Sequence, residues 1–428
     1  MTHASGKLRR TLTLPGAVLL GLGSILGTGA FVALGTAAGI AGPLAAPALV
    51  IAAMAAALNG LSSAQLAAAH PVSGGAYAYG TRFLSPQAGF LAGVMFLCAK
   101  TASAAAAALG LAGYLAPLLP GVPQALVAFG LVAAVTGLVM VGLRSASGVN
   151  AGLVAVTVTA LLVLPASALV HPPAAFAPPA PTEGSQSITD MLRAAALLFV
   201  AFAGYGRIAT LGEDVRDPGR TIPRAIVATL ILSVLLYALV LWTGLHVLGA
   251  DAFARSTAET AAPLSALASR LGGEALAVLV GIGAMTAMAS VLLNLILGLS
   301  RVVLAMGRNG DMPNPLAGLD AKGQPTAASL AVGAGTGFLA LAGGFEAVWS
   351  VSAVTVLIYY AIMNAAALRL DEPRRLYPRA VPVAGLGLCM GLAVWIDLTA
   401  WLWALALGLC AFGGRAILRA ATGERPGH

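Results

Sequence analysis

Two glycine-rich interruptions of apolar segments are the places in this sequence where bare backbone groups could bind a ligand. The first is the run Gly27-Thr28-Gly29, inside an apolar segment at about residues 14–40. Glycine costs a helix about 1 kcal/mol relative to alanine, and unpaired backbone groups are costly in lipid. We therefore expect the helix to break here and to line a cavity. A half-helix starting near Thr28 would present free N–H groups and a positive dipole end, which suit a carboxylate.

The second interruption is Gly204-Tyr205-Gly206, in the middle of the apolar segment at about residues 190–212, and Arg207 follows it. Paired interruptions in corresponding halves of a chain are typical of transporters built from inverted repeats. The alternative interpretation is that these glycines only allow close helix packing, since small residues at regular spacing are common between membrane helices.

Lys100 is an ionisable residue inside the third apolar segment, about one turn before Ala104. A lysine near the centre of a bilayer costs about 3 kcal/mol on insertion scales and is a functional candidate by default. It could pair with a second carboxylate of a ligand, or lose its proton and carry it across the membrane. Alternatively, it snorkels to the interface or caps a buried carbonyl.

The composition indicates the class of protein. Hydrophobic residues make up 59% of the 428 positions and charged residues 9%, whereas a soluble domain carries about 25% charged residues. We therefore expect an all-α membrane protein. The cysteines Cys98, Cys389 and Cys410 all lie in apolar segments and indicate neither a disulfide nor a metal site. We expect no cofactor.

Twelve apolar segments are predicted to cross the bilayer. Their approximate extents are 14–40, 43–68, 87–116, 122–142, 147–170, 190–212, 223–248, 273–305, 325–343, 346–368, 381–396 and 398–417. With both termini cytoplasmic, the inner segments hold all of the 23 basic residues except Lys100, Arg193, Arg255 and Arg270. This asymmetry follows the positive-inside rule, which explains the net charge of +8 better than nucleic-acid binding does.

Four motifs, in order along the chain, resemble those of amino acid permeases of the amino acid–polyamine–organocation (APC) superfamily. They belong to the first span, the first inner loop, the loop after the sixth span and the end of the eighth span. In this sequence they are Gly23–Phe31, Pro71–Tyr77, Gly212–Pro223 and Ser300–Pro313.

The resemblance implies a leucine-transporter-type fold with a 5+5 inverted repeat, in which helices 1 and 6 are broken. The segments at 14–170 and 190–368 would be the two repeats (helices 1–5 and 6–10), and helices 11 and 12 at 381–417 would be additions. Residues 1–13 and 418–428 would be cytoplasmic termini.

The resemblance also implies a site for an amino acid at the two breaks. The carboxylate would bind the N–H groups of Thr28 and Gly29 and the Thr28 hydroxyl, and the α-ammonium would bind carbonyls at the breaks. Gly27 and Gly204 would keep side chains from blocking this approach. The predicted carbonyls belong to Ile25, Val200 and Ala203, and the predicted side-chain pocket consists of Ala104, Tyr205, Asn294 and Leu295.

The coupling ion stays open at this point. Many relatives have a lysine in the fifth span, where this chain has Thr157, and an acidic residue after the sixth-span break, where it has Gly206. Thr157 and Ser290, with carbonyls near Gly23 and Leu26, could form a sodium site, because hydroxyls and carbonyls suit a hard cation. Alternatively, both hydroxyls bond back to their own helices. Inner-gate ion pairs are predicted at Glu213, Arg216 and Arg301. Alternatively, these residues belong to solvated loops that only follow the positive-inside rule.

The sequence thus predicts a multi-pass cell-membrane protein and secondary active transporter of small or neutral L-amino acids. A basic substrate is disfavoured because no Asp or Glu lies at mid-membrane. The alternative is a transporter or exchanger of acidic or other small organic substrates that uses Lys100. An enzyme is not expected, because the five His are scattered and no buried carboxylate pair is apparent.

The lipid bilayer and an amino acid are the predicted partners, with a proton or sodium as the co-transported ion, and nucleic acid is not. A channel is the competing interpretation, and its continuous pore would require rings of polar residues. The particular amino acid, the coupling ion or exchange mode, the direction of flux, and the choice between monomer and homodimer stay open.

Overall fold

The structure is a computed structural model that describes residues 12–70, 74–141, 147–170, 187–209, 215–321 and 323–422. The helices of its first half are α1 (Leu14–Ile25), the π-helix η1 (Gly29–Ala33), α2 (Leu34–Ala41), η2 (Gly42–Leu44), α3 (Ala45–Ala69), α4 (Gly75–Phe83), α5 (Pro86–Leu115), η3 (Ala116–Leu118), α6 (Gln124–Met140) and α7 (Ser147–Val170). The helices of its second half are α8 (Ile188–Phe202), η5 (Ala203–Tyr205), α9 (Gly206–Ala209), α10 (Pro218–Val247), α11 (Ala250–Thr260), α12 (Pro263–Arg308), η6 (Asn314–Ala317), α13 (Thr326–Ala342), α14 (Phe345–Leu368), η7 (Glu372–Arg374), α15 (Ala380–Ala393) and α16 (Leu398–Thr422).

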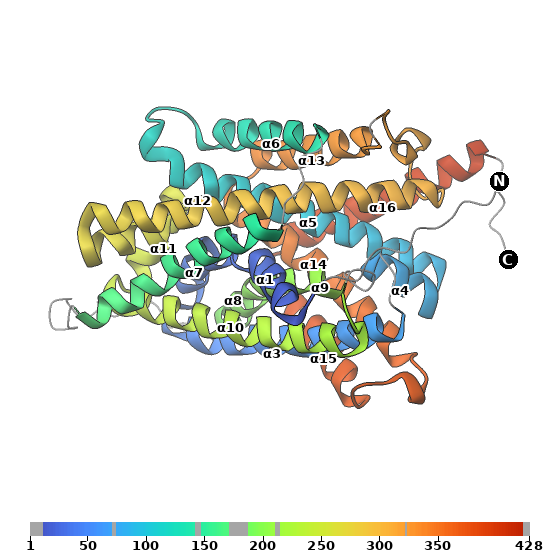
Figure 1. Cartoon of the computed structure of the whole chain (residues 1–428), viewed down its shortest axis with the longest axis horizontal. Helices are drawn as coiled ribbons and strands as arrows, with labels where there is room; N and C mark the ends of the chain where they lie inside the picture. The colour runs from blue at the N-terminus through green and yellow to red at the C-terminus, as the bar shows by residue number, and fades with distance from the viewer. Residues whose placement is uncertain are drawn as a thin grey trace.

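The helices form one elongated bundle around the short α1, α8 and α9 (Figure 1). Helix α5 packs against both α12 and α14, α3 packs against both α8 and α10, and α6 pairs with α13 along one side. The run Ala104–Ala108 on α5 is completely buried. Side chains this small let neighbouring helices approach closely, which is how helices associate in lipid.

Local sequence signals set several helix ends. Helix α5 begins at Pro86, and the Ser85 hydroxyl accepts a hydrogen bond of 3.1 Å from the Ala88 N–H. Helix α8 begins with a capping box, in which the side chains of Ser187 and Asp190 each accept a hydrogen bond from the backbone N–H of the other residue. Helix α12 is kinked at Gly272–Gly273, where Gly273 has φ +68°.

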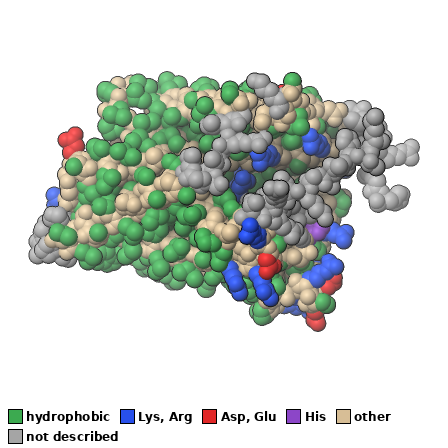
Figure 2. Space-filling model, viewed as in Figure 1, with side chains coloured by type: hydrophobic (Ala, Val, Ile, Leu, Met, Phe, Trp, Pro, Cys, Tyr) green, Lys and Arg blue, Asp and Glu red, His purple; other side chains and the backbone are tan. Residues whose placement is uncertain are grey.

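The apolar content of the helices fits a membrane. Among the described residues, eight helical stretches are long and apolar enough to cross a bilayer, and four further apolar helices have 10–17 residues. Figure 2 shows a surface dominated by hydrophobic side chains, with Lys and Arg gathered toward the end where α4 lies. The protein is therefore an integral membrane protein of helical type.

Candidate functional site

The first helix is interrupted next to its glycine run. Helix α1 ends at Ile25, and the new half-helix begins with hydrogen bonds from the Ala30 and Phe31 N–H groups to the Gly27 carbonyl, at 3.0 and 3.1 Å. The N–H groups of Thr28 and Gly29 precede these bonds, in the turn where a helix has no internal acceptors for them. The buried Thr28 hydroxyl has no hydrogen-bond partner.

The second interruption follows α8. The α-helix ends at Phe202, a single 3-10 turn spans Ala203–Tyr205, and four residues of helix α9 follow. The Ala203 N–H bonds back to the Val200 carbonyl, as expected of a helix end. The change of hydrogen-bond pattern directs the Ala203 carbonyl into the bundle, where it accepts a hydrogen bond from another helix.

The two interruptions lie against each other. A Cβ on Gly29 would come within 2.8 Å of the Ala201 Cα, and one on Gly204 would clash with the backbone of Ser24. Both glycines therefore allow a close approach of one break to the other. This geometry agrees with the interpretation that the glycines allow close helix packing. The close approach also brings the backbone groups of both breaks together.

Tyr237 of α10 joins the two breaks, and no local sequence pattern predicts this role. Its buried hydroxyl lies 2.9 Å from the Ile25 carbonyl and 3.1 Å from the Ala201 carbonyl, with the geometry of a donor to either. One of the carbonyls predicted for a substrate ammonium, that of Ile25, thus already has a protein donor. The Gly27 N–H also donates to the Ile25 carbonyl, at 3.0 Å, so both lone pairs of this carbonyl have protein donors within reach.

A cavity of about 330 Å³ opens at the breaks and reaches Gly74–Tyr77 at the end of the bundle where α4 lies. Most of the predicted site residues line it. They are Ile25, Gly27, Thr28, Gly29, Lys100, Val200, Ala203, Gly204, Asn294, Leu295 and Arg301. Ala104 and Tyr205 are completely buried and lie outside the lining; the Tyr205 ring instead packs on that of Tyr360.

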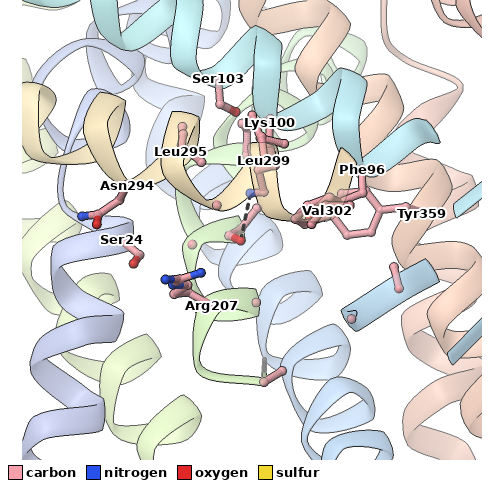
Figure 3. A pocket seen from close by; sticks show the side chains of 18 of the residues that line it. Ser24, Phe96, Lys100, Ser103, Arg207, Asn294, Leu295, Leu299, Val302 and Tyr359 are labelled. Atoms are coloured by element: carbon pink, nitrogen blue, oxygen red, sulfur yellow. Dashed lines mark hydrogen bonds between the residues drawn. The ribbon is translucent and has the colours of Figure 1, made fainter. Parts of the chain in front are cut away.

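Lys100 lies inside this cavity wall and is 9% exposed. Its ammonium group donates a hydrogen bond of 3.1 Å to the Ala203 carbonyl at the second break, drawn as the dashed line in Figure 3. This is the carbonyl-capping geometry that the sequence left as one alternative. It also means that a protein cation occupies a position predicted for a substrate ammonium.

Arg207 is the functional candidate that the sequence analysis missed. The charge asymmetry predicts Arg207 in an inner segment, whereas in the structure it is half-buried and lines the cavity directly after the second break. In Figure 3 its guanidinium group extends into the space that also holds Lys100 and Asn294. Its position immediately after Gly206 was the available signal, because a residue at a helix break shares the site that the break creates.

The residues of the predicted sodium site also come together. Gly23, Leu26, Thr157 and Ser290 line a second, small cavity, which has no room for a water molecule. The Thr157 hydroxyl donates back to the Leu153 carbonyl at 2.8 Å. Ser290 is within 3.4 Å of the Asn294 amide, which connects this cavity with the larger one.

The predicted gate residues are separated. Arg301 lines the cavity, whereas Arg216 is exposed outside it, and Glu213 lies outside the described residues. A different cluster lies at this end of the bundle. Asp311, just after the end of α12, forms an ion pair of 2.7 Å with the buried Arg415 of α16 and accepts a hydrogen bond of 2.7 Å from Tyr77.

No group of three or more His, Cys, Asp or Glu side chains in the described ranges could hold a metal ion. The ligand groups of the large cavity are therefore backbone N–H and C=O groups, hydroxyls, one amide and basic side chains.

An apolar helical bundle with a central cavity at two interrupted helices is the architecture of a membrane transporter. The sequence profile of the family described as amino acid permease matches residues 16–417. The chain therefore belongs to the amino acid permease family, which confirms the family predicted from the four motifs.

Individual relatives differ in what their names say they carry. A protein of Mycobacterium tuberculosis (strain ATCC 25618 / H37Rv), described as an uncharacterized transporter, is 42% identical over 423 residues, covering 96% of this chain and 92% of that protein. The branched-chain amino acid permease BcaP of Bacillus subtilis (strain 168) is 27% identical over 444 residues, covering 96% and 94%. The methylthioribose transporter of the same strain is 28% identical over 342 residues, covering 75% and 71%.

Proposed function

We propose that this protein is a secondary active transporter that carries amino acids across the cell membrane by alternating access. The observation that carries the proposal is the cavity formed where the interrupted helices meet. It contains the first N–H groups of a half-helix, the carbonyls of a second break and an unpartnered hydroxyl, that of Thr28. Such ends of discontinuous helices bind charged substrates and ions in transporters.

In the proposed binding mode the substrate carboxylate meets the N–H groups of Thr28 and Gly29. The dipole of the half-helix favours a negative charge there. The α-ammonium binds the break carbonyls of Val200 and Ala203, each of which already accepts one hydrogen bond, from the Ala203 N–H and from Lys100 respectively.

The proposed architecture has twelve spans, a 5+5 inverted repeat and cytoplasmic termini. Support for it comes from the apolar helices that coincide with all twelve predicted segments and from the interruptions at corresponding places in 14–170 and 190–368. The basic side chains gather at the end where α4 lies, and the positive-inside rule makes that end cytoplasmic.

For the substrate, two candidates are compared, and one is a small neutral amino acid. It is supported by apolar lining residues such as Val200 and Leu295 and by the name of the branched-chain relative. The second candidate is an acidic substrate, and a specific observation favours it: both Lys100 and Arg207 lie in the cavity wall.

For the coupling, three modes are proposed for comparison: sodium at Thr157 and Ser290, a proton carried by Lys100, and exchange. A test would use purified protein in liposomes and labelled amino acids, with a sodium gradient, a proton gradient or neither. Saturable uptake of at least one amino acid is expected. Absence of uptake of every amino acid by correctly folded protein would contradict the proposed function.

Substitutions separate the coupling modes. Sodium-driven uptake that persists in Lys100→Ala and is lost in Thr157→Val would identify the hydroxyl site. Thr136→Val is the matched control, because Thr136 makes the same bond to its own helix (2.7 Å) on α6. Proton-driven uptake that is lost in Lys100→Ala would make Lys100 the proton carrier.

A further inference from the structure

The wall of the large cavity carries basic side chains from three different elements. Lys100 comes from α5, Arg207 from the start of α9, and Arg301 from α12. Among the described residues that line the cavity, none is Asp or Glu. The three side chains range from buried (Lys100) through half-buried (Arg207) to exposed (Arg301), so positive charge extends along the cavity.

The polar groups at the breaks add hydrogen-bond donors to this positive charge. Two of the break carbonyls, those of Ile25 and Ala203, accept from Tyr237 and Lys100. Thr28, by contrast, is 4% exposed and lines the cavity, and its buried hydroxyl has no hydrogen-bond partner. The groups that remain for a ligand are thus mainly donors.

The buried ammonium group of Lys100 has a neutral hydrogen-bond partner, and a negative charge would stabilise it further. The Ala203 carbonyl gives Lys100 a dipole but no opposite charge, and burial of an ion without a counter-charge is unfavourable. Because the effective dielectric constant inside a protein is low, an anion placed in this cavity would be attracted more strongly than in water.

We propose that the cavity is specific for amino acids whose side chain carries a negative charge. The α-carboxylate binds at the half-helix that starts at Thr28, and the side-chain carboxylate binds Arg207, with Lys100 supplying a second positive charge. A guanidinium group binds carboxylates through two parallel hydrogen bonds, which makes Arg207 a specificity-determining residue. Arg301, at the exposed end, attracts anions toward the cavity. This inference rests on the proposed function and narrows its substrate class.

The test compares substrates of nearly equal size that differ in charge. Liposomes that contain the protein are loaded with one unlabelled amino acid, and counterflow of the same amino acid in labelled form is measured for glutamate, aspartate, glutamine, asparagine and lysine in turn. The same five amino acids are then compared as competitors of labelled glutamate. We expect glutamate and aspartate to compete at least tenfold better than glutamine and asparagine, since a hydrogen bond to a charged group is worth about 1.5–3 kcal/mol. Lysine should not compete.

Two variants test whether Arg207 causes the preference for negatively charged side chains. Arg207→Gln should lose the tenfold preference while glutamine is still carried. Arg308→Gln removes an exposed arginine of α12 that does not line the cavity and should keep the preference. The wild-type competition series decides the substrate class even where Arg207→Gln fails to fold.

The outcomes distinguish this inference from the proposed function. Equal competition by glutamine and glutamate, or stronger competition by lysine, would overturn the inference and leave amino acid transport intact. Glutarate, which has both carboxylates but no α-ammonium, should compete poorly. Competition by glutarate as strong as by glutamate would keep the anionic class and contradict recognition of an amino acid. Counterflow of none of the amino acids would contradict the proposed function itself.

Discussion

Tyr237 connects the two interrupted helices through a single hydroxyl group. Helix breaks expose carbonyls that lipid cannot satisfy, and this buried side chain lies within hydrogen-bonding distance of one carbonyl on each break. The ammonium group of Lys100 donates a hydrogen bond to a third carbonyl at the breaks, that of Ala203. Two side chains from neighbouring helices thus compensate for backbone groups that the breaks leave without helical partners.

Replacing Tyr237 by phenylalanine should therefore destabilise the protein. The variant keeps the ring and leaves the carbonyls of Ile25 and Ala201 without this donor, a loss of about 1–3 kcal/mol for a buried group. The measurement is the thermal unfolding midpoint in detergent, which should fall. Tyr377→Phe, in the loop before α15, serves as the control. An equal unfolding midpoint in both variants would show that the hydroxyl of Tyr237 does not contribute to stability.

Some of these residues can be predicted from the sequence and others cannot. Lys100 was singled out because a charge inside an apolar segment is conspicuous without any structure. Arg207 was missed because it was counted with the basic residues of an inner segment. Tyr237 lies 212 residues from Ile25 in the chain, and a tyrosine in an apolar helix has no local pattern that reveals its partner.

At the scale of elements, the interruptions were predictable because glycine clusters inside apolar segments conflict with helix formation. The structure breaks the helices at both places. The sequence could not predict that Gly29 and Gly204 face the opposite break, because that contact depends on how two distant helices pack. The same limit explains why Ala104 and Tyr205, placed by counting along helices, lie outside the cavity lining.

Gly204→Ala should disturb the contact between the breaks. The added methyl group would overlap backbone atoms of Ser24, which cannot rotate away as a side chain can, and overpacking of this kind costs about 1–3 kcal/mol. We expect lower thermal stability and impaired transport. In Gly281→Ala, on α12, the new methyl group meets no atom within 4 Å, so that variant should retain both properties. Unchanged stability of Gly204→Ala would contradict the close approach.

At the scale of the whole molecule, ion pairs lie at both ends of the bundle. At one end Arg193 of α8 pairs with Asp397 at 2.8 Å and with Glu346 at 3.3 Å. At the other end Asp311 links α12, α4 and α16 through Arg415 and Tyr77. The guanidinium of Arg415 also lies over the Phe90 ring of α5, 4.2 Å from its centroid. Helix α16 is thereby fixed to elements that form the mouth of the cavity.

Asp311→Asn should weaken this attachment strongly. Arg415 is 7% exposed, and removing one partner of a buried ion pair typically costs about 3–5 kcal/mol. A thermal unfolding curve would measure the loss. Asp371→Asn, an exposed carboxylate near the same end, should have little effect. Equal curves for the two variants would refute a structural role for the Asp311 cluster.

The same cluster predicts a response to alkaline pH. Burial, and then the hydrogen bond to Asp311, raise the pKa of Tyr77 from 10.0 to about 12. Between these values the unfolded chain has lost this proton and the folded protein keeps it, so stability falls as pH rises. Unfolding of the wild type should therefore become easier across this range more steeply than unfolding of Tyr77→Phe. Parallel pH profiles of the two proteins would contradict the raised pKa.

The lack of acidic side chains in the described cavity lining has a consequence for the membrane potential. A substrate with one net negative charge is repelled from the inside of an energised cell by about 2.3 kcal/mol per 100 mV. A carboxylate in the cavity could offset this by taking up a proton with the substrate, but these lining residues provide none. Accumulation of such a substrate would then require an accompanying cation or the exit of another anion. A potassium diffusion potential imposed across the liposomes would distinguish electrically driven uptake from neutral exchange.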